Sequence, residues 1–148
     1  MMMRTVVRAA ATALAMAGAA IGLAGPAHAD DLSGTYTLLS DQSQRAVNGT
    51  LNPYPSSSAT WIITPCGAGC ARVASATGWT ADARLVNGRW EFSREAVWSC
   101  PDGRQLPNTI GYSFDAATLT GTSTGRIPVG CEGFPVNVEG IRVSLTRR

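Results

Sequence analysis

The chain contains no lysine, and its only histidine is His28. His28 lies in the small-residue pattern Ala27-His28-Ala29, just before Asp30, and this pattern is typical of a signal-peptide cleavage site. Cleavage after Ala29 would leave a mature chain with neither lysine nor histidine. Such a chain lacks the usual general base, the Schiff-base amine and the imidazole ligand of metal sites. The sequence therefore predicts a protein that is not an enzyme and has no catalytic residue, no cofactor and no metal site.

The N-terminal region has no acidic residues, and its apolar stretch is too short for a good membrane span. Arg4 and Arg8 precede an uncharged, mostly apolar stretch that is rich in alanine and glycine, and Pro26 follows it. This order predicts a secretory signal peptide over residues 1–29 and a single disulfide-bonded β domain over residues 30–148. We expect a protein that is secreted to the extracellular space or associated with the cell envelope, without a membrane span.

The predicted mature chain has no excess of either charge. Removing Arg4 and Arg8 from the 12 basic residues leaves ten arginines, which match the 10 acidic residues and give a net charge of zero. A neutral domain has no overall field that would attract a polyanion. The composition therefore argues against a nucleic-acid partner.

The chain has only four cysteines, Cys66, Cys70, Cys100 and Cys131. An even number in an exported chain predicts two disulfides, although three pairings are possible. Hairpin geometry favours Cys66 with Cys70, which leaves Cys100 with Cys131. The C-x₃-C spacing and the absence of histidine argue against a zinc site. A redox-active disulfide is the weaker alternative, because its usual motif is C-x-x-C.

No window of the mature chain has sustained helical periodicity. Short runs of β-branched and aromatic residues alternate instead with clusters of glycine, asparagine, aspartate and proline, which predicts an all-β fold. The expected strands are 34–40, 59–65, 71–76, 81–86, 89–99, 109–115, 119–126 and 137–146. Their order predicts an antiparallel meander of about eight strands that closes into an up-and-down β-barrel, with a two-sheet sandwich as the alternative. The polar segment 41–58 is expected to be irregular, exposed and mobile, and a β-bulge is expected at Gly140.

The strand at 89–99 alternates most clearly. Trp90, Phe92, Arg94 and Trp98 share one parity, whereas Glu91 and Glu95 share the other, so the first set is expected to point inward. A buried guanidinium needs an anionic partner, and Arg94 could clamp a ligand carboxylate. It could equally form an internal ion pair or turn outward at a bulge or strand end. The candidate ligand-binding residues are Trp90, Phe92, Arg94, Trp98 and Tyr112; the aromatic members could instead be ordinary core.

Several short sequence elements follow one another in this chain with a characteristic spacing. They are Gly34-Thr35-Tyr36-Thr37, Thr60-Trp61, Cys66 and Cys70, Gly78-Trp79, Gly88-Arg89-Trp90 and Cys100-Pro101-Asp102-Gly103. With these elements the chain resembles small secreted proteins of mycobacteria and related actinobacteria, a group of unknown function. The resemblance implies export and a disulfide-bonded domain, and it implies no reaction. Gly34 and Tyr36, together with the hairpin order, are also similar to the start of lipocalin- and avidin-type barrels.

Three functional hypotheses remain open from the sequence. The leading one is an exported, non-enzymatic binding module for a small apolar or amphipathic ligand. The first alternative is a secreted surface or interaction protein with a filled core, whose partner would be an envelope or host protein. The second is a small carbohydrate hydrolase that uses two carboxylates, for which no pair stands out. A cavity lined by tryptophan and Arg94 would favour the first hypothesis.

Overall fold

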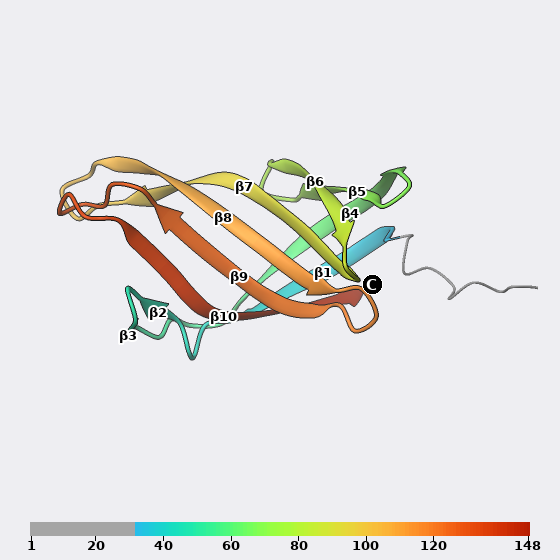
Figure 1. Ribbon diagram of the computed structural model, residues 1–148, viewed down its shortest axis with the longest axis horizontal. Coiled ribbons are helices and arrows are strands. Elements are labelled where there is room, and N and C mark those ends of the chain that lie inside the picture. Colours follow the sequence, from blue (N-terminus) through green and yellow to red (C-terminus); the bar gives the residue numbers. More distant parts are fainter. Residues whose placement is uncertain (1–31) are drawn as a thin grey trace, which may run out of the picture.

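The computed structural model describes residues 32–148, which contain strands and no helix (Figure 1). The strands are β1 (Gly34–Asp41), β2 (Ala46–Val47), β3 (Thr50–Leu51), β4 (Ser57–Gly67), β5 (Cys70–Ser75), β6 (Thr80–Val86), β7 (Arg89–Ser99), β8 (Gln105–Asp115), β9 (Thr120–Ile127) and β10 (Val136–Arg147). The predicted signal peptide, residues 1–29, lies outside the described residues. Within residues 32–148 there is no helix that is long and apolar enough to cross a membrane.

The sheet closes on itself. From β4 to β10 each strand pairs antiparallel with the next, and β1 pairs with both β4 and β10. The result is an up-and-down barrel, as predicted, and the sandwich alternative is wrong because β1 joins the two ends of the meander. Closure leaves none of the barrel strands with an unpaired edge. The short hairpin of β2 and β3 attaches to the edge of β10 and lies outside this cycle.

The structure corrects two predictions, one for segment 41–58 and one for the start of the strand predicted at residue 109. Segment 41–58 is not simply irregular and exposed, because it contains β2 and β3 and buries the side chain of Arg45. Strand β8 begins at Gln105 and not at residue 109, since Pro107 continues the ladder opposite Val97. Proline obscures a strand in sequence because it lacks the N–H group, but it is tolerated where that donor is not needed.

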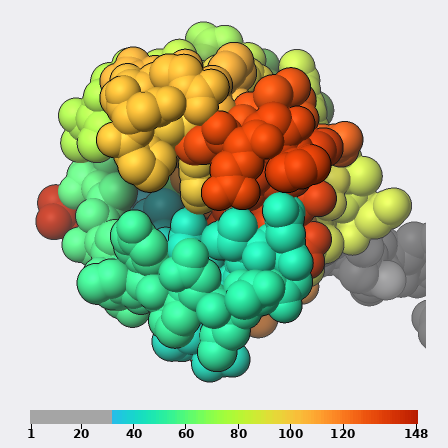
Figure 2. Space-filling model, turned by 90° about the vertical axis from the view of Figure 1, so that its left-hand side faces the viewer, coloured from blue at the N-terminus to red at the C-terminus, as the bar shows by residue number. Residues whose placement is uncertain are grey.

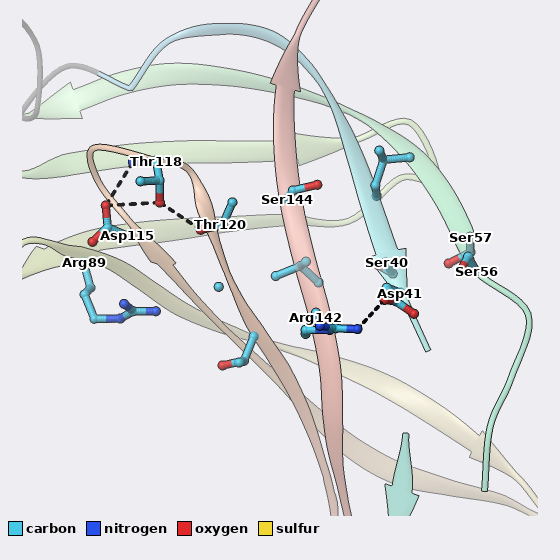
Figure 3. Close-up of a pocket in the computed structure, with 14 residues that line it drawn as sticks. Ser40, Asp41, Ser56, Ser57, Arg89, Asp115, Thr118, Thr120, Arg142 and Ser144 are labelled. Atoms are coloured by element: carbon cyan, nitrogen blue, oxygen red, sulfur yellow. Dashed lines mark hydrogen bonds and ion pairs between the residues drawn. The ribbon is translucent and has the colours of Figure 1, made fainter. Parts of the chain in front are cut away.

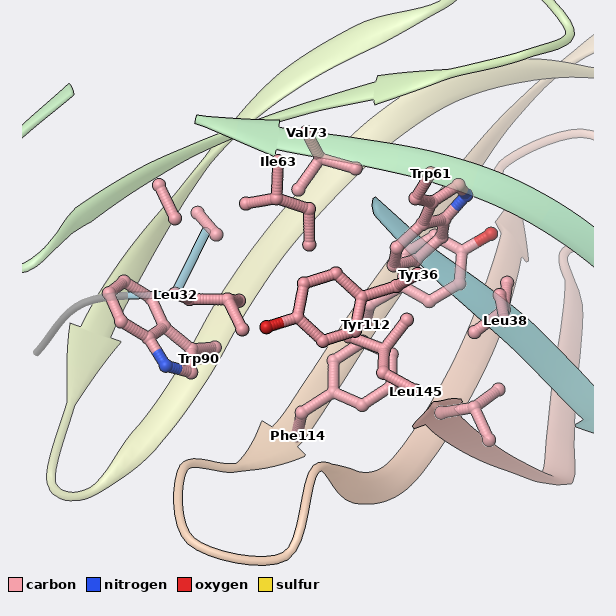
Figure 4. Close-up of a cluster of buried hydrophobic side chains, with 13 residues drawn as sticks. Leu32, Tyr36, Leu38, Trp61, Ile63, Val73, Trp90, Tyr112, Phe114 and Leu145 are labelled. Carbon is pink, nitrogen blue, oxygen red and sulfur yellow. The ribbon is translucent and has the colours of Figure 1, made fainter. Parts of the chain in front are cut away.

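Alternation along the strands creates the core. In β4 the side chains of Trp61 and Ile63 are each 1% exposed, whereas Ile62 between them is 55% exposed. The ring of Trp61 lies in the middle of an aromatic cluster, with centroid distances of 5.2 to 5.9 Å to four neighbouring rings, those of Trp79, Phe92, Tyr112 and Phe114. Figure 4 shows the surrounding side chains filling the space between strands from opposite sides of the barrel.

The predicted bulge at Gly140 is confirmed. The pairing of β10 with β9 shifts register between Val138 and Ile141, and Gly140 lies in this shift with a φ of 76°. The main-chain carbonyl of Gln44 occupies the place where a Cβ of residue 140 would stand. Gly140 therefore serves two purposes, the left-handed backbone and the close approach of the segment that carries Arg45.

We expect Gly140→Ala to destabilise the fold by more than Gly88→Ala. Both glycines have a φ of 76°, so both substitutions meet the left-handed penalty of about 1–2 kcal/mol. Only at residue 140 would the new methyl group also collide with backbone, since the Cβ position at Gly88 has no atom within 4 Å. Equilibrium denaturation of the two variants measures the difference. Equal losses would contradict a role for Gly140 in seating the Gln44–Arg45 segment.

The cysteines form the two pairs that hairpin geometry favours. Cys66 and Cys70 close the β4–β5 hairpin with a Cα–Cα distance of 5.0 Å, and Cys100 and Cys131 are joined at 5.6 Å. Asp82 lies near Cys66 and Cys70. The two cysteine sulfurs are bonded to each other and are not thiolates that could bind a metal. Two disulfides fit an exported protein.

Candidate functional site

The two ends of the barrel differ. At one end, three segments surround a hollow: the β7–β8 turn, the β9–β10 loop and residues 42–56. Figure 2 looks onto this end, with the turn in gold, the loop in orange-red and residues 42–56 in blue-green. The disulfide between Cys100 and Cys131 ties the turn to the loop, and Arg104 donates a hydrogen bond of 2.7 Å to the carbonyl of Cys131.

Two neighbouring spaces, which share Trp98 as a lining residue, lie at this open end. The inner space, which we call the chamber, has a volume of about 260 Å³ and is lined by residues that include Arg45, Trp98, Asn108, Ile110, Tyr112 and Ser123. The outer space, which we call the vestibule, has a volume of about 350 Å³ and is lined by residues that include Val47, Trp98, Pro101, Phe134 and Val136. Trp98 lines both, so its indole ring stands between them.

Arg45 is the buried cation of the chamber. Its side chain is 8% exposed, and its guanidinium carbon lies 4.5 Å from the ring centre of Tyr54 and 6.0 Å from that of Trp98. Nη1 donates a hydrogen bond of 3.1 Å to the carbonyl of Asn52. These contacts hold the charge between two aromatic rings and leave other N–H donors free to face the chamber.

Local hydrogen bonds set the position of Arg45. The carboxylate of Asp41 accepts the N–H of Ser43, and the carbonyl of Gln42 accepts the N–H of Arg45, so the chain turns directly after β1. The carbonyl of Arg45 then accepts the N–H of Asn52. Sequence reasoning missed Arg45 because it lies in a polar segment without strand periodicity, and no local signal separates it from an exposed arginine.

Arg94 points inward, as the parity of β7 predicts. Its guanidinium carbon lies 4.6 Å from the ring centre of Trp79, and its Nε is buried without a hydrogen-bond partner in residues 32–148. Arg94 does not belong to the chamber wall, although Ile110, its partner across the β7–β8 ladder, does. Arg94 is therefore a partly buried cation outside the chamber wall, and its guanidinium lies over the face of the Trp79 ring.

The other predicted residues divide between the chamber and the core. Trp98 and Tyr112 line the chamber, whereas the ring of Phe92 stacks on that of Tyr112 at 4.9 Å. Trp90 is 1% exposed and pairs with Phe114 at the opposite end of β7 from Trp98. The structure therefore places Trp90 in the core and not in the chamber wall, because hydrophobic side chains fill that half of the barrel.

Two polar residues of the chamber were not predicted. Asn108 of β8 is 7% exposed, and its Oδ1 has no hydrogen-bond partner within the described range. Ser123 of β9 is also buried. Beside them Gly125 leaves space, since a Cβ there would lie 3.4 Å from Asn108 Oδ1. Buried amide groups are normally hydrogen-bonded, and the unpaired Oδ1 is an acceptor that a hydrogen-bond donor would satisfy.

The chamber has an uncompensated positive charge. In the described chain no aspartate or glutamate is among the buried residues, and the ion pairs are Arg72–Asp82, Arg104–Asp102 and Arg142–Asp41, all exposed. Neither Arg45 nor Arg94 takes part in them. The buried guanidinium of Arg45 in the chamber wall favours an anion there.

A larger groove, with a volume of about 920 Å³, lies on the outside of β1, β9 and β10 (Figure 3). Its charged groups are already engaged. Arg142 pairs with Asp41 at 2.9 Å, and Asp115 accepts the backbone N–H groups of Ala117 and Thr118.

These bonds affect the acid–base properties of the groove. Hydrogen bonds from the backbone of Thr118 and Ala117 lower the pKa of Asp115, and the backbone hydrogen bond from Ser43 lowers the pKa of Asp41. A general acid in glycoside hydrolysis needs a raised pKa. Neither carboxylate of the groove meets this requirement.

Comparison with known proteins identifies the fold but gives no family or function. No protein-family model matches the chain, and no curated protein matches it. Among solved structures the chain is similar to a monomer form of the M. tuberculosis PknI sensor domain, with 16% identity, a TM-score of 0.56 and coverage of 80% of this chain and 88% of that chain. At this identity the similarity shows a shared fold. The chain thus shares its barrel fold with a mycobacterial domain.

Proposed function

We propose that the protein is a non-enzymatic binding module that holds a small amphipathic anion in the chamber. The observation that carries this proposal is Arg45, a buried arginine in the chamber wall that takes part in none of the ion pairs of residues 32–148. Burying a guanidinium without an anion costs free energy, and a ligand carboxylate, sulfate or phosphate would recover part of that cost. Asn108 also lines the chamber, and its amide NH₂ group is the donor that could contact an anionic guest.

The chamber supplies contacts of two kinds. Arg45, Asn108 and Ser123 are polar, whereas Trp98 and Ile110 give apolar surface. A mostly preformed cavity with a few converging polar groups is the usual form of a small-molecule site. The name of the structural neighbour, a sensor domain, agrees with a binding role, and we extend that role to this chain as a proposal.

We expect Arg45→Gln to weaken the binding of sodium octanoate by about tenfold or more, because a charge-assisted hydrogen bond contributes about 1.5–3 kcal/mol. Arg94→Gln should weaken it by less, since Arg94 does not line the chamber. The matched control is Arg84→Gln, which removes an exposed arginine on the outside of β6 and should change nothing. Isothermal titration calorimetry measures the affinities, and thermal melts check that each variant is folded.

Two results would refute the proposal. One is an affinity for octanoate that Arg45→Gln leaves unchanged. The other is equal affinity for octanoate and octan-1-ol in the unaltered protein, because an anion site must discriminate between them. Arg45→Lys keeps the charge, and we expect it to retain part of the affinity that Arg45→Gln loses.

One observation favours the interaction-protein alternative. Leu51, Tyr54, Val129 and Phe134 are exposed apolar side chains in the segments that surround the open end. Such side chains could contact an envelope or host protein. The chamber argues for the small ligand, because a pure interaction surface has no need of a cavity with buried, unpaired polar groups.

A further inference from the structure

Polarity changes along the axis of the site. The inner chamber holds Arg45, Asn108 and Ser123. The outer vestibule has apolar surface from Val47, Trp98, Pro101, Phe134 and Val136, and its polar residues are Asn48, Ser99 and Glu132. The polar groups of the chamber therefore lie deepest and the apolar surface of the vestibule lies next to solvent. A site for a wholly apolar molecule would have the opposite arrangement, with its apolar surface innermost.

The sizes of the two spaces matter as much as their polarity. The chamber, at about 260 Å³, falls below the usual range for small-molecule sites of about 300–1,000 Å³. The vestibule adds about 350 Å³ directly across Trp98. An anionic head group with a short hydrocarbon chain fits the chamber, and a longer chain would extend past Trp98 into the vestibule.

From this arrangement we infer, on the basis of the proposed function, that the ligand class is a single-chain anionic amphiphile that enters head first. Its head group contacts Arg45 and Asn108 in the chamber. Its chain crosses Trp98 and lies in the vestibule against Phe134 and Val136, with its far end at the mouth of the barrel.

Phe134 forms the outermost part of this path. Its side chain is 68% exposed, although it lines the vestibule. The loop that carries it is anchored by the disulfide at Cys131 and by a backbone hydrogen bond of 2.7 Å from Gly130 to the carbonyl of Phe134. A large exposed aromatic side chain on an anchored loop has surface available for a ligand chain, which would cover it on binding.

The test compares acetate with octanoate by NMR titration, which measures weak and strong binding alike. Acetate has the head group only, so its binding depends on the proposed function and not on the vestibule. Octanoate should bind at least about tenfold more tightly than acetate, because burying two of its six additional methylene groups is enough for this ratio. Equal affinities would overturn the head-first assignment and leave the anion site standing.

Two variants test where the hydrocarbon chain of octanoate lies. Phe134→Ser should reduce the ratio of octanoate to acetate affinity by about threefold or more while leaving acetate binding unchanged. The matched control is Val129→Ser, an exposed apolar residue in the same loop that does not line the vestibule, and it should leave the ratio unchanged. A ratio unaffected by Phe134→Ser would overturn the inference. Absence of binding by both probes would overturn the proposed function itself.

Discussion

Replacing Trp61 by alanine is expected to lower the free energy of unfolding by about 3–5 kcal/mol, the largest effect of any single substitution that we predict. Trp61 is 1% exposed, and its ring contacts four other aromatic rings from β7, β8 and the β5–β6 turn. Its loss would leave a cavity where strands from opposite sides of the barrel meet. Those strands belong to a closed, hydrogen-bonded sheet, so the surrounding backbone has little freedom to collapse into the space.

The control for this prediction is the next residue of the same strand. Ile62 is 55% exposed on the outside of β4, and Ile62→Ala should change stability by no more than about 0.5 kcal/mol. Guanidinium denaturation at equilibrium, with both disulfides intact, gives the two values. A loss below about 1 kcal/mol for Trp61→Ala would show that the aromatic cluster repacks and is not the centre of the core.

Removing the disulfide between Cys100 and Cys131 is expected to lower stability by about 3–4 kcal/mol, because it closes a loop with a sequence separation of 31 residues. The disulfide between Cys66 and Cys70 spans only 4 residues, and its removal should cost about 2 kcal/mol. On the loop-entropy model, the longer loop restricts the unfolded chain more strongly, so opening it returns more conformational freedom to that state.

Denaturation of the two double-serine variants tests this ranking. Cys66→Ser with Cys70→Ser serves as the matched comparison, since both variants lose one disulfide and gain two hydroxyl groups. A larger loss from opening the short loop would contradict the ranking. It would mean that the hairpin disulfide acts mainly through native contacts and not through the unfolded state.

Much of the barrel could be predicted from local sequence. In β7 the alternation of Trp90, Phe92 and Trp98 with Glu91 and Glu95 defines which face is inside, because side chains in a strand point to opposite faces in turn. Asn87-Gly88 marks the β6–β7 hairpin, and Gly140 marks the bulge of β10. These features depend only on residues that are close together along the chain.

The candidate site was only partly predictable. Parity indicates that Arg94 points inward, but it cannot indicate that Trp79 would cover its guanidinium, since these residues come from different hairpins. No local sequence pattern indicated that Arg45 would be buried. It is buried because the segment that follows β1 folds back over the bulge at Gly140, about a hundred residues later in the chain.

The sequence by itself determined the all-β class, the hairpin order, the inward face of each strand and the likeliest cysteine pairing, because each of these follows from local periodicity, turn chemistry or short spacing. Only the tertiary structure decided that β1 pairs with β10, that one half of the barrel is filled and that the other half holds a chamber with Arg45 in its wall. The physical reason is distance along the chain. Closure, filling and the burial of a charge depend on which side chains from remote strands meet, and the total volume of those side chains has no local pattern in the sequence.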